Sequence, residues 1–418
     1  MTYPYIVPIE FDHQKDLILT NIVSAKNEYL YDSFGKRHLD LRTGLWNISL
    51  GYQEDYLNLI QQSFEHSVKK GMFYLDLRCL STDIYSEYAL NLLEFANEES
   101  AHFSKVFFTN SGSEGTEIAL KVTHKLTSRK EILAFQDGYH GTYFGGMSVS
   151  GVDVELSRSY LNVQDYVTFF EIPTTDEAKS KLTHHIMTNG ENIGAFIFEP
   201  VLGSGGTQTL DINYLNHLLD LCKQKQIITI FDEVATGFYK TGTRFFYNHL
   251  NIKPDILILG KTINNGILPF GTVIIGERVN QLLKKSLIEH FSTQNGNILA
   301  IQTANVTLNY LLQHESSIIN NIQYIDNVIR TTLEEYNVPF NGTGVMYSIP
   351  IDSSITTELV YNHLEKLGVL VSQYAFTEWG HHRSGISIFP PYFLDFKKFK
   401  QALQLIAKTI NSYPNLRR

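Results

Sequence analysis

Short apolar runs rich in β-branched residues recur through the middle of the chain, and they constrain the fold more than any other feature. The runs lie at residues 106–109, 131–135, 195–198, 227–231, 256–259 and 272–275. Amphipathic stretches with helical spacing separate several of them, for example residues 213–225. Buried strands that alternate with helices are typical of a mostly parallel sheet covered on both faces. The sequence therefore predicts an α/β fold.

The two ends of the chain carry a different pattern. Residues 28–40 predict two short strands joined by a turn at Gly35, and residues 300–336 predict a long helical stretch. A strand at residues 345–351 and a final helix at residues 396–410 follow. These shorter elements predict a separate α+β unit.

The length of the chain, 418 residues, exceeds one ordinary hydrophobic core. We therefore expect a large domain at residues 54–305. Residues 1–53 and 306–418 are expected to form a smaller domain together.

Composition limits the class of protein. Hydrophobic residues make up 43% and charged residues 18%, which is the balance of a globular protein. The net charge of −9 fits an enzyme for small molecules better than a nucleic-acid binder, which usually carries a basic face. The two cysteines, Cys79 and Cys222, are too few for a disulfide framework or a metal cluster. We expect no metal, no nucleic acid and a cytoplasmic location.

The chain carries no sign of membrane insertion or export. No apolar run approaches the roughly 20 residues of a membrane span. Residues 1–12 lack the basic and apolar regions of a signal peptide. We therefore expect no membrane partner.

Small polar residues follow the strand predicted at 106–109 and lead into a helical stretch. At a helix N-terminus, Ser111, Gly112 and Ser113 would let backbone N–H groups and hydroxyls converge on a phosphate. An ordinary helix cap would have a similar sequence. The segment is a candidate phosphate site that needs support from its neighbours.

Two further predicted strands end in residues that complement a phosphate site. Asp232 follows residues 227–231, where a carboxylate can hold a protonated pyridine nitrogen or simply form an acidic turn. Lys261 follows residues 256–259; a buried lysine can form an imine with an aldehyde, whereas an exposed one is only a surface charge. Ligands sit at the carboxyl ends of strands in such sheets. Together these features predict a site for pyridoxal 5′-phosphate (PLP).

Several longer segments resemble the class III aminotransferases, PLP enzymes of fold type I. They are NSGSEGTEIALK (110–121), GYHGTYFGGMSV (138–149), FEP (198–200), FDEVATGF (231–238), PDILILGKTINNG (254–266) and STQNGNILA (292–300). The similarity extends to both ends through YLYDSFGKRHLDLRTGLWN (29–47) and FPPYF (389–393). The resemblance implies a mostly parallel seven-stranded sheet between helices, bound PLP and aminotransferase activity.

The resemblance also implies a role for each residue of the predicted site. Lys261 would hold PLP as a Schiff base and move a proton, and Asp232 would bind the ring nitrogen. Tyr139 and Val234 would lie on the two faces of the ring. Thr293 would reach the phosphate in a neighbouring subunit, which predicts a homodimer with active sites at the interface. The other implied cofactor-binding residues are Ser111, Gly112, Ser113, His140 and Glu199.

The sequence departs from the family on the substrate side. Many members carry an arginine before the Pro-Pro pair that binds the substrate's carboxylate, and Ser387 stands there in this chain. Arg383 is the nearest arginine, and it either replaces the missing one or lies at the surface. Trp46, which resembles an aromatic residue of the ω-amino acid branch, either lines the substrate pocket or packs in the core. Lys240 replaces an arginine usual in the family, which affects the prediction for its loop.

These features predict an aminotransferase that moves an amino group from a donor to a carbonyl acceptor by a ping-pong mechanism. The missing arginine leaves room for a donor without a carboxylate at its reacting end, such as a small amine, an aminoketone or a modified peptide. A decarboxylase, racemase or aminomutase of the same fold would keep Lys261, Asp232 and Ser113, and the sequence separates these alternatives poorly. A non-catalytic binding protein of this fold would have lost Lys261 or Asp232, and both are present.

Overall fold

The structure is a computed structural model that describes residues 19–98, 100–152, 154–160, 166–286 and 288–413. Residues 1–12, which bear on the expectation about a signal peptide, lie outside this set. In the part of the chain that the structure describes, no helix is long and apolar enough to cross a membrane.

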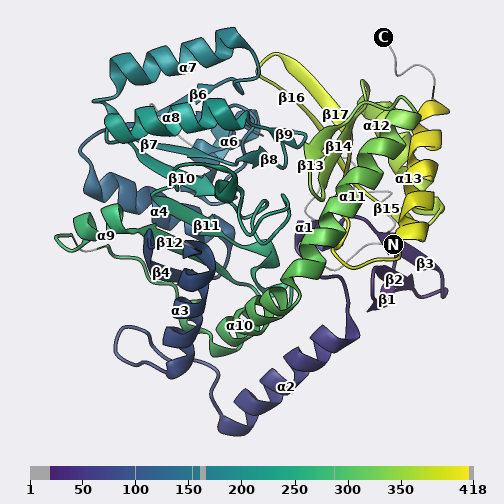
Figure 1. Ribbon diagram of the computed structural model, residues 1–418, viewed down its shortest axis with the longest axis horizontal. Helices are drawn as coiled ribbons and strands as arrows, with labels where there is room; N and C mark the ends of the chain where they lie inside the picture. Colours follow the sequence, from purple (N-terminus) through teal and green to yellow (C-terminus); the bar gives the residue numbers. More distant parts are fainter. Residues whose placement is uncertain (1–18, 99, 153, 161–165, 287, 414–418) are drawn as a thin grey trace.

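A sheet with the strand order β4-β12-β11-β10-β7-β5-β6 forms the centre of the larger half of the molecule (Figure 1). Its strands are β4 Phe103–Thr109, β12 Gly271–Gly276, β11 Ile256–Leu259, β10 Ile228–Asp232, β7 Ile193–Phe198, β5 Glu131–Phe135 and β6 Val167–Phe170. β12 is antiparallel to both of its neighbours, and the remaining neighbouring pairs are parallel. This mostly parallel sheet confirms the predicted fold class.

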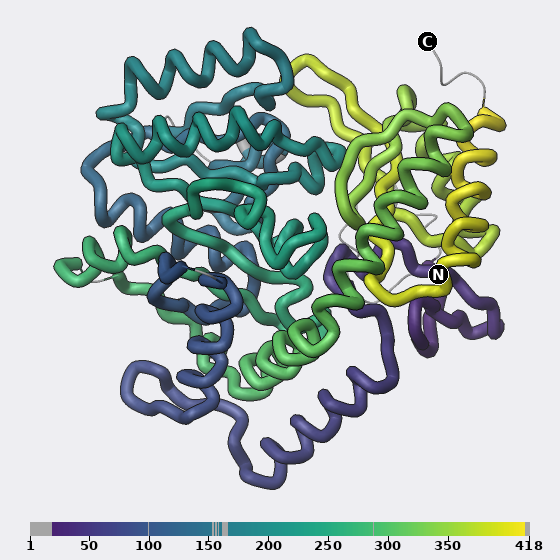
Figure 2. The backbone as a smooth tube through the Cα atoms, viewed as in Figure 1, coloured from purple at the N-terminus to yellow at the C-terminus, as the bar shows by residue number. Residues whose placement is uncertain are grey.

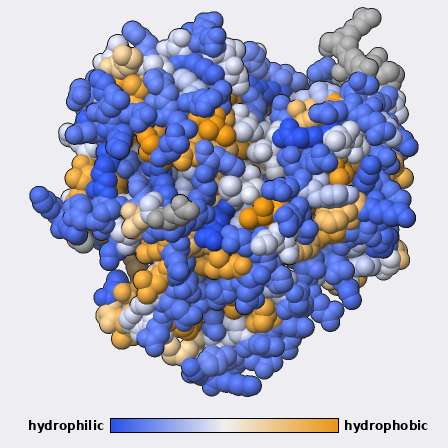
Figure 3. Space-filling view, viewed as in Figure 1, coloured by the Kyte–Doolittle hydropathy of each residue, from blue (hydrophilic) through white to orange (hydrophobic). Residues whose placement is uncertain are grey.

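The strands of this sheet place alternate side chains on two covered faces. Ile230 packs in one core with Ile118 of α4 (Gly112–Leu126). The next residue, Phe231, packs in the other core with Leu218 of α8 (Ile212–Gln224). Because both faces of the central strands are buried, β7, β10 and β11 are almost wholly apolar instead of alternating with polar residues. The outer surface in Figure 3 is mainly hydrophilic, with apolar side chains in small groups.

The remaining helices of the larger half surround the sheet or extend from it (Figure 1). They are α2 Glu54–Lys70, α3 Asp83–Asn97, α5 Phe144–Val149, α6 Val154–Tyr160, α7 Asp176–Asn189, α9 Glu277–Leu283 and α10 Ile298–Gln313. α10 packs on α2 and α3, which places the beginning of the C-terminal part of the chain against the larger half.

Both ends of the chain build the smaller half, which lies on the right in Figures 1 and 2. One sheet combines β1 (Ile22–Lys26), β2 (Tyr29–Asp32) and β3 (Arg37–Asp40) with β15 (Val369–Leu370), which is parallel to β3. As predicted, Gly35 lies in the turn between β2 and β3, with a φ of 81°. The domain boundaries at residues 53 and 305 stay predictions.

A second sheet of the smaller half is antiparallel, in the order β13-β14-β17-β16. Its strands are β13 Asn341–Thr343, β14 Met346–Pro350, β16 Ser372–Glu378 and β17 His381–Ile388. The helices of this half are α11 Glu315–Glu335, α12 Ser354–Lys366 and α13 Phe396–Asn411. α12 packs on β16 and β17, and α11 packs on α13.

Differences from the sequence-based expectation include one strand of the large sheet and the long helical stretch. β6 is not among the predicted strands, because it is only half-buried and its pattern is therefore weak. The helical stretch predicted at 300–336 is broken at His314, whose φ of −106° and ψ of 10° are not helical. On either side of the break, α10 packs on the larger half and α11 packs on α13.

Candidate active site

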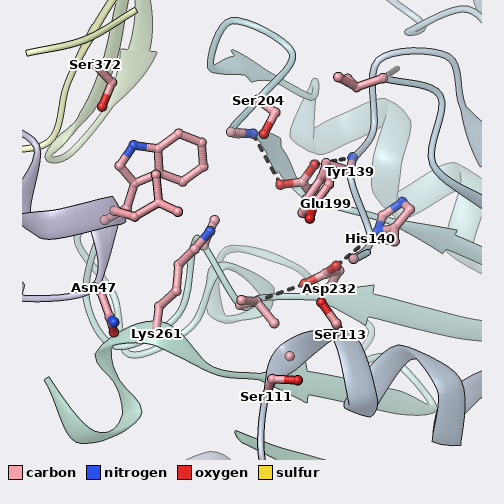
Figure 4. A pocket seen from close by; sticks show the side chains of 18 of the residues that line it. Asn47, Ser111, Ser113, Tyr139, His140, Glu199, Ser204, Asp232, Lys261 and Ser372 are labelled. Atoms are coloured by element: carbon pink, nitrogen blue, oxygen red, sulfur yellow. Dashed lines mark hydrogen bonds and ion pairs between the residues drawn. The ribbon is translucent and has the colours of Figure 1, made fainter. Parts of the chain in front are cut away.

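A cavity of about 760 Å³ lies at the carboxyl ends of β10 and β11. Its wall combines loops of the large sheet with the β16–β17 hairpin and with α1 (Thr43–Trp46). Figure 4 shows Lys261 and Asp232 directed into the space between them, with Ser372 of the hairpin on the far side. The predicted residues that line this cavity are Trp46, Ser111, Gly112, Ser113, Tyr139, His140, Glu199, Asp232, Val234 and Lys261.

The segment before α4 shapes one end of the cavity. Ser111 caps the helix, because its side chain accepts a hydrogen bond from Glu114 N at 3.2 Å. A Cβ at Gly112 would lie 2.5 Å from Val234 Cγ2, so glycine is needed for this close approach. Ser111, Gly112 and Ser113 line the cavity, so the positive end of the α4 dipole faces it and suits a phosphate.

Asp232 is the last residue of β10 and is almost fully buried. Its Oδ2 lies 3.0 Å from His140 Nδ1, and its Oδ1 accepts a hydrogen bond from Val234 N at 3.1 Å. His140 is held in turn, because its backbone N–H donates to Ser150 Oγ at 2.8 Å. These contacts fix a carboxylate at the strand end, where it can accept a hydrogen bond from a protonated ring nitrogen.

Lys261 begins the short helix η3 (Lys261–Asn264) directly after β11, and its backbone has a left-handed φ of 47°. Residues other than glycine rarely adopt this conformation, and such strain is concentrated at functional sites. Burial lowers the pKa of the Lys261 amine, and the charges of Glu199 and Asp232 oppose this shift. A lowered pKa increases the fraction of the amine that is neutral, and therefore nucleophilic, at a given pH.

Glu199 lines the cavity between Tyr139 and Gly203. The backbone N–H groups of Tyr139 and Gly203 donate to its two carboxylate oxygens, at 2.9 and 3.3 Å. Burial raises the pKa of this carboxyl to about 7, and the charge of Asp232 adds to the rise. The group therefore changes charge near neutral pH.

Of the two residues predicted to bind the substrate, Trp46 lines the cavity and Arg383 does not. Trp46 lines the cavity and also packs in the core, where its ring stacks on Phe389 at 4.5 Å. Arg383 is not among the described residues that line the cavity, and its Nη1 is ion-paired with Asp137 Oδ2 at 2.6 Å. Ser387 does line it. The guanidinium is thus committed to a carboxylate of the protein itself.

Thr293 begins the short helix η4 (Thr293–Gly296), is exposed and does not line this cavity. Its role in a neighbouring subunit stays a prediction.

Tyr374 and Phe376 of β16 line the cavity although the sequence analysis does not identify them. The alternating half-buried pattern of β16 does not distinguish a pocket wall from an ordinary sheet edge.

Lys240, which replaces the family's arginine, lies in the loop that follows Phe238 and Tyr239. Its side chain is buried, and its Nζ donates to the Thr262 hydroxyl. Burial lowers the pKa of Lys240 well below its ordinary value, and the charge of Lys261 adds to this effect. Phe238 and Tyr239, just before it, have positive φ values of 60° and 75°. The unusual residue therefore belongs to a tightly packed loop beside η3.

The residues around the cavity fit PLP. The N-terminus of α4, with its close-approach glycine, would hold the phosphate, the fixed carboxylate of Asp232 would hold the ring nitrogen, and Lys261, whose pKa is lowered, lines the same cavity and would hold the aldehyde carbon. Across the residues that the structure describes, no group of three or more His, Cys, Asp or Glu side chains could hold a metal ion.

This sheet, with its strand-end aspartate and lysine, defines a PLP-dependent enzyme of fold type I. The family model described as "Aminotransferase class-III" matches residues 11–410. The chain therefore belongs to the class III aminotransferases, which use PLP.

Relatives and solved structures agree with this membership. Acetylornithine aminotransferase from Lactococcus lactis is 32% identical over 293 residues, covering 69% of this chain and 71% of that one. Adenosylmethionine-8-amino-7-oxononanoate aminotransferase from Helicobacter pylori is 28% identical, covering 94% and 92%. A Bacillus anthracis aminotransferase structure has a TM-score of 0.87 at 20% identity, covering 98% and 96%.

A further structure, taurine:2-oxoglutarate aminotransferase from Bifidobacterium kashiwanohense in complex with PLP and glutamate, has a TM-score of 0.85 at 21% identity. It covers 98% of this chain and 96% of that one. At these identities the solved structures show the fold alone. The names of these proteins differ in substrate, so membership of the family does not define the donor.

Proposed function

We propose that this aminotransferase works by two half-reactions, in a ping-pong mechanism, with a donor that carries no carboxylate at its reacting carbon. The ion pair between Arg383 and Asp137 carries the proposal, because it keeps the guanidinium from the cavity wall where Ser387 stands. The donor would be a small amine, an aminoketone or a modified peptide, and the acceptor a carbonyl compound.

The charges around the cavity support a donor without a carboxylate. Lys261 is the one lysine or arginine among the described residues of the wall, and its amine is the reactive group. The carboxyls of Glu199 and Asp232 line the same cavity. A substrate carboxylate would meet no cationic clamp on this wall.

The proposed roles follow from the positions of the side chains. Bound PLP would supply an electron sink for the charge that develops at the donor's reacting carbon. Lys261 Nζ would hold the cofactor and, once the donor displaces it, accept the proton of that carbon. Asp232, oriented by His140, would keep the ring nitrogen protonated. Tyr139 and Val234 would flank the ring, and Ser111, Gly112 and Ser113 would hold the phosphate.

We propose a homodimer in which Thr293 reaches the cofactor of the partner subunit. Two observations support it. Thr293 is exposed, and a second cavity of about 640 Å³ lies beside it, lined by Ser292 and Gln294. This second cavity shares Asn110 with the active-site cavity. The mass of the protein in solution, measured by light scattering, tests the dimer, and loss of PLP affinity in Thr293→Ala tests the contact.

We also propose a cytoplasmic location. Cys79 is an exposed free thiol and Cys222 a buried one, which fits a reducing compartment. Fractionation of cells that express the protein tests this proposal.

A single half-reaction tests the proposed donor class. The purified holoenzyme is mixed, without acceptor, with either phenylethylamine or phenylalanine, which differ only in the carboxylate. We expect the amine to convert the cofactor's visible absorbance faster and to yield the matching aldehyde. Faster conversion by phenylalanine would contradict the donor class.

The same experiment tests the reaction type. If no donor from a wider panel converted the cofactor or yielded a carbonyl product, the transamination itself would be contradicted. Release of carbon dioxide from an amino acid would instead support the decarboxylase alternative.

A further inference from the structure

The β16–β17 hairpin carries a tryptophan at its tip that contacts the opposite half of the molecule. In Figures 1 and 2 the yellow hairpin extends from the smaller half toward the large sheet. Trp379 lies in the turn between the two strands, and its ring centroid stands 5.3 Å from that of Phe169 in β6. The indole Nε1 donates hydrogen bonds to Gln136 O at 2.9 Å and to Gly151 O at 3.0 Å.

These two carbonyls lie at the two ends of the 136–151 segment, which carries residues of the predicted cofactor site. Gly151 N donates to Gly138 O at 2.8 Å, and a Cβ at Gly151 would lie only 2.0 Å from Gln136 O. The 136–151 segment therefore leaves and returns to the sheet at one point, and Tyr139 and His140 lie within it. The indole N–H of Trp379 therefore joins the two ends of the 136–151 segment.

A second contact fastens the hairpin to the same segment. Arg383 of β17 is ion-paired with Asp137, the residue after Gln136. Asp137 is buried, and burial raises the pKa of its carboxyl while the charge of Arg383 opposes the rise. Without Arg383 this carboxylate would be a buried charge with little compensation, so the pair favours the attached position of the hairpin.

The fastened hairpin is also a wall of the active-site cavity. Tyr374 and Phe376 of β16 line that cavity. At its root the hairpin belongs to the sheet of β14, where Ser348 accepts a hydrogen bond from Thr207 Oγ1 of the larger half at 2.8 Å. The element is thus attached at its root, along its length and at its tip.

We propose that Trp379 and Arg383 are positioning residues that couple the substrate wall to the cofactor segment. Through them the hairpin holds Tyr374 and Phe376 as a fixed limit on donor size, and it holds the 136–151 segment closed around the cofactor. This inference rests on the proposed function in assigning cofactor contacts to that segment.

The first test measures cofactor affinity, which is independent of the donor. Trp379→Phe keeps the ring but removes the N–H, and Trp379→Ala removes both. We expect the dissociation constant of the apo-protein for PLP to rise about threefold for Trp379→Phe and about tenfold for Trp379→Ala. Thr377→Ala is the matched control, because its side chain is exposed and its hydroxyl is hydrogen-bonded to His382 within the hairpin.

The second test measures donor size. With amines of increasing chain length, we expect the ratio of kcat/KM for long over short donors to rise in Trp379→Ala relative to Thr377→Ala. Limited proteolysis should cut the hairpin faster in the same variant. If Trp379→Ala does not fold, as judged by circular dichroism, Trp379→Phe carries both tests.

The ion pair provides an independent test. Arg383→Gln should weaken PLP binding more than Asp137→Asn/Arg383→Gln, because the double variant leaves no unpaired buried charge. Unchanged PLP affinity in both variants overturns the part assigned to Arg383.

The proposal is overturned if Trp379→Ala matches Thr377→Ala in both cofactor affinity and donor size. It is also overturned if only one of the two changes, because the wall and the segment would then be independent. If no donor reacts with any variant while PLP affinity still changes as expected, the assigned donor chemistry fails and the cofactor half of the coupling stands.

Discussion

The indole of Trp46 covers the amine of Lys261, whose Nζ lies 4.3 Å from the ring centroid. Trp46 is fixed in turn by its stacking on Phe389 and is 9% exposed. The ring has two opposed effects on the lysine. It excludes water, which disfavours the charged amine, and its face attracts a cation, which favours it.

We expect the first effect of Trp46 to dominate, because burial is the largest cause of the lowered Lys261 pKa. Trp46→Ala should therefore raise the pKa of the amine in the apo-protein. The pH dependence of the rate at which PLP combines with apo-protein measures this pKa. Trp46→Phe is the control, since it keeps an aromatic cover, and a lowered pKa in Trp46→Ala would show that the cation–π contact dominates.

Lys261→Ala should reduce the half-reaction rate by about a hundredfold or more, because it removes the group that moves the proton. Lys261→Arg should be equally impaired, since a guanidinium stays protonated at neutral pH. Stopped-flow absorbance measures the rate.

Borohydride reduction followed by peptide mass spectrometry identifies the lysine that holds the cofactor. Cofactor on Lys240, whose buried side chain donates to Thr262 of η3, would contradict the assignment.

Glu199→Gln should alter the pH dependence of stability of the apo-protein. The folded-state pKa of about 7 lies above the ordinary 4.5, so the folded form binds the proton more tightly than the unfolded form. The contribution of Glu199 to stability is therefore greatest below pH 4.5 and is lost as pH rises through 7.

Glutamine cannot ionise, so the stability of the variant relative to the native protein should rise by up to about 3 kcal/mol between pH 5 and a pH above neutral. The amide nitrogen cannot accept the N–H of Tyr139 or Gly203, which adds a cost to the variant that does not vary with pH. Urea unfolding at both pH values measures this rise. A difference that does not vary with pH would mean that Glu199 has an ordinary pKa.

Ser387→Arg should restore a carboxylate clamp. A guanidinium at this buried cavity position could bind a donor carboxylate through two hydrogen bonds. We expect kcat/KM for phenylalanine to rise about tenfold relative to phenylethylamine. Ser387→Met, of comparable length but uncharged, is the control, and an equal effect of methionine would assign the change to cavity shape alone.

Much of the large sheet could be predicted from the sequence because its strands are buried on both faces. The run that contains Ile258 is wholly apolar, and the run that contains Phe231 is interrupted only by the buried Thr229. Asp232 follows the Phe231 run, Lys261 comes after the Ile258 run and Gly260, and the structure places both at the cavity. In these central strands, burial on both faces produces the apolar run that can be read in the sequence. β6 was missed because its four residues are only half-buried, so its sequence pattern is weak.

The sequence by itself determined the α/β class, the order of the strand-end residues and the family similarity, since these depend on contiguous patterns. Only the tertiary structure decided what Arg383 binds, because Asp137 is remote in sequence and lies on the other half of the molecule. The break at His314 and the attachment of Trp379 have the same origin. Each depends on the surface that an element meets after folding, and a local pattern does not encode that surface.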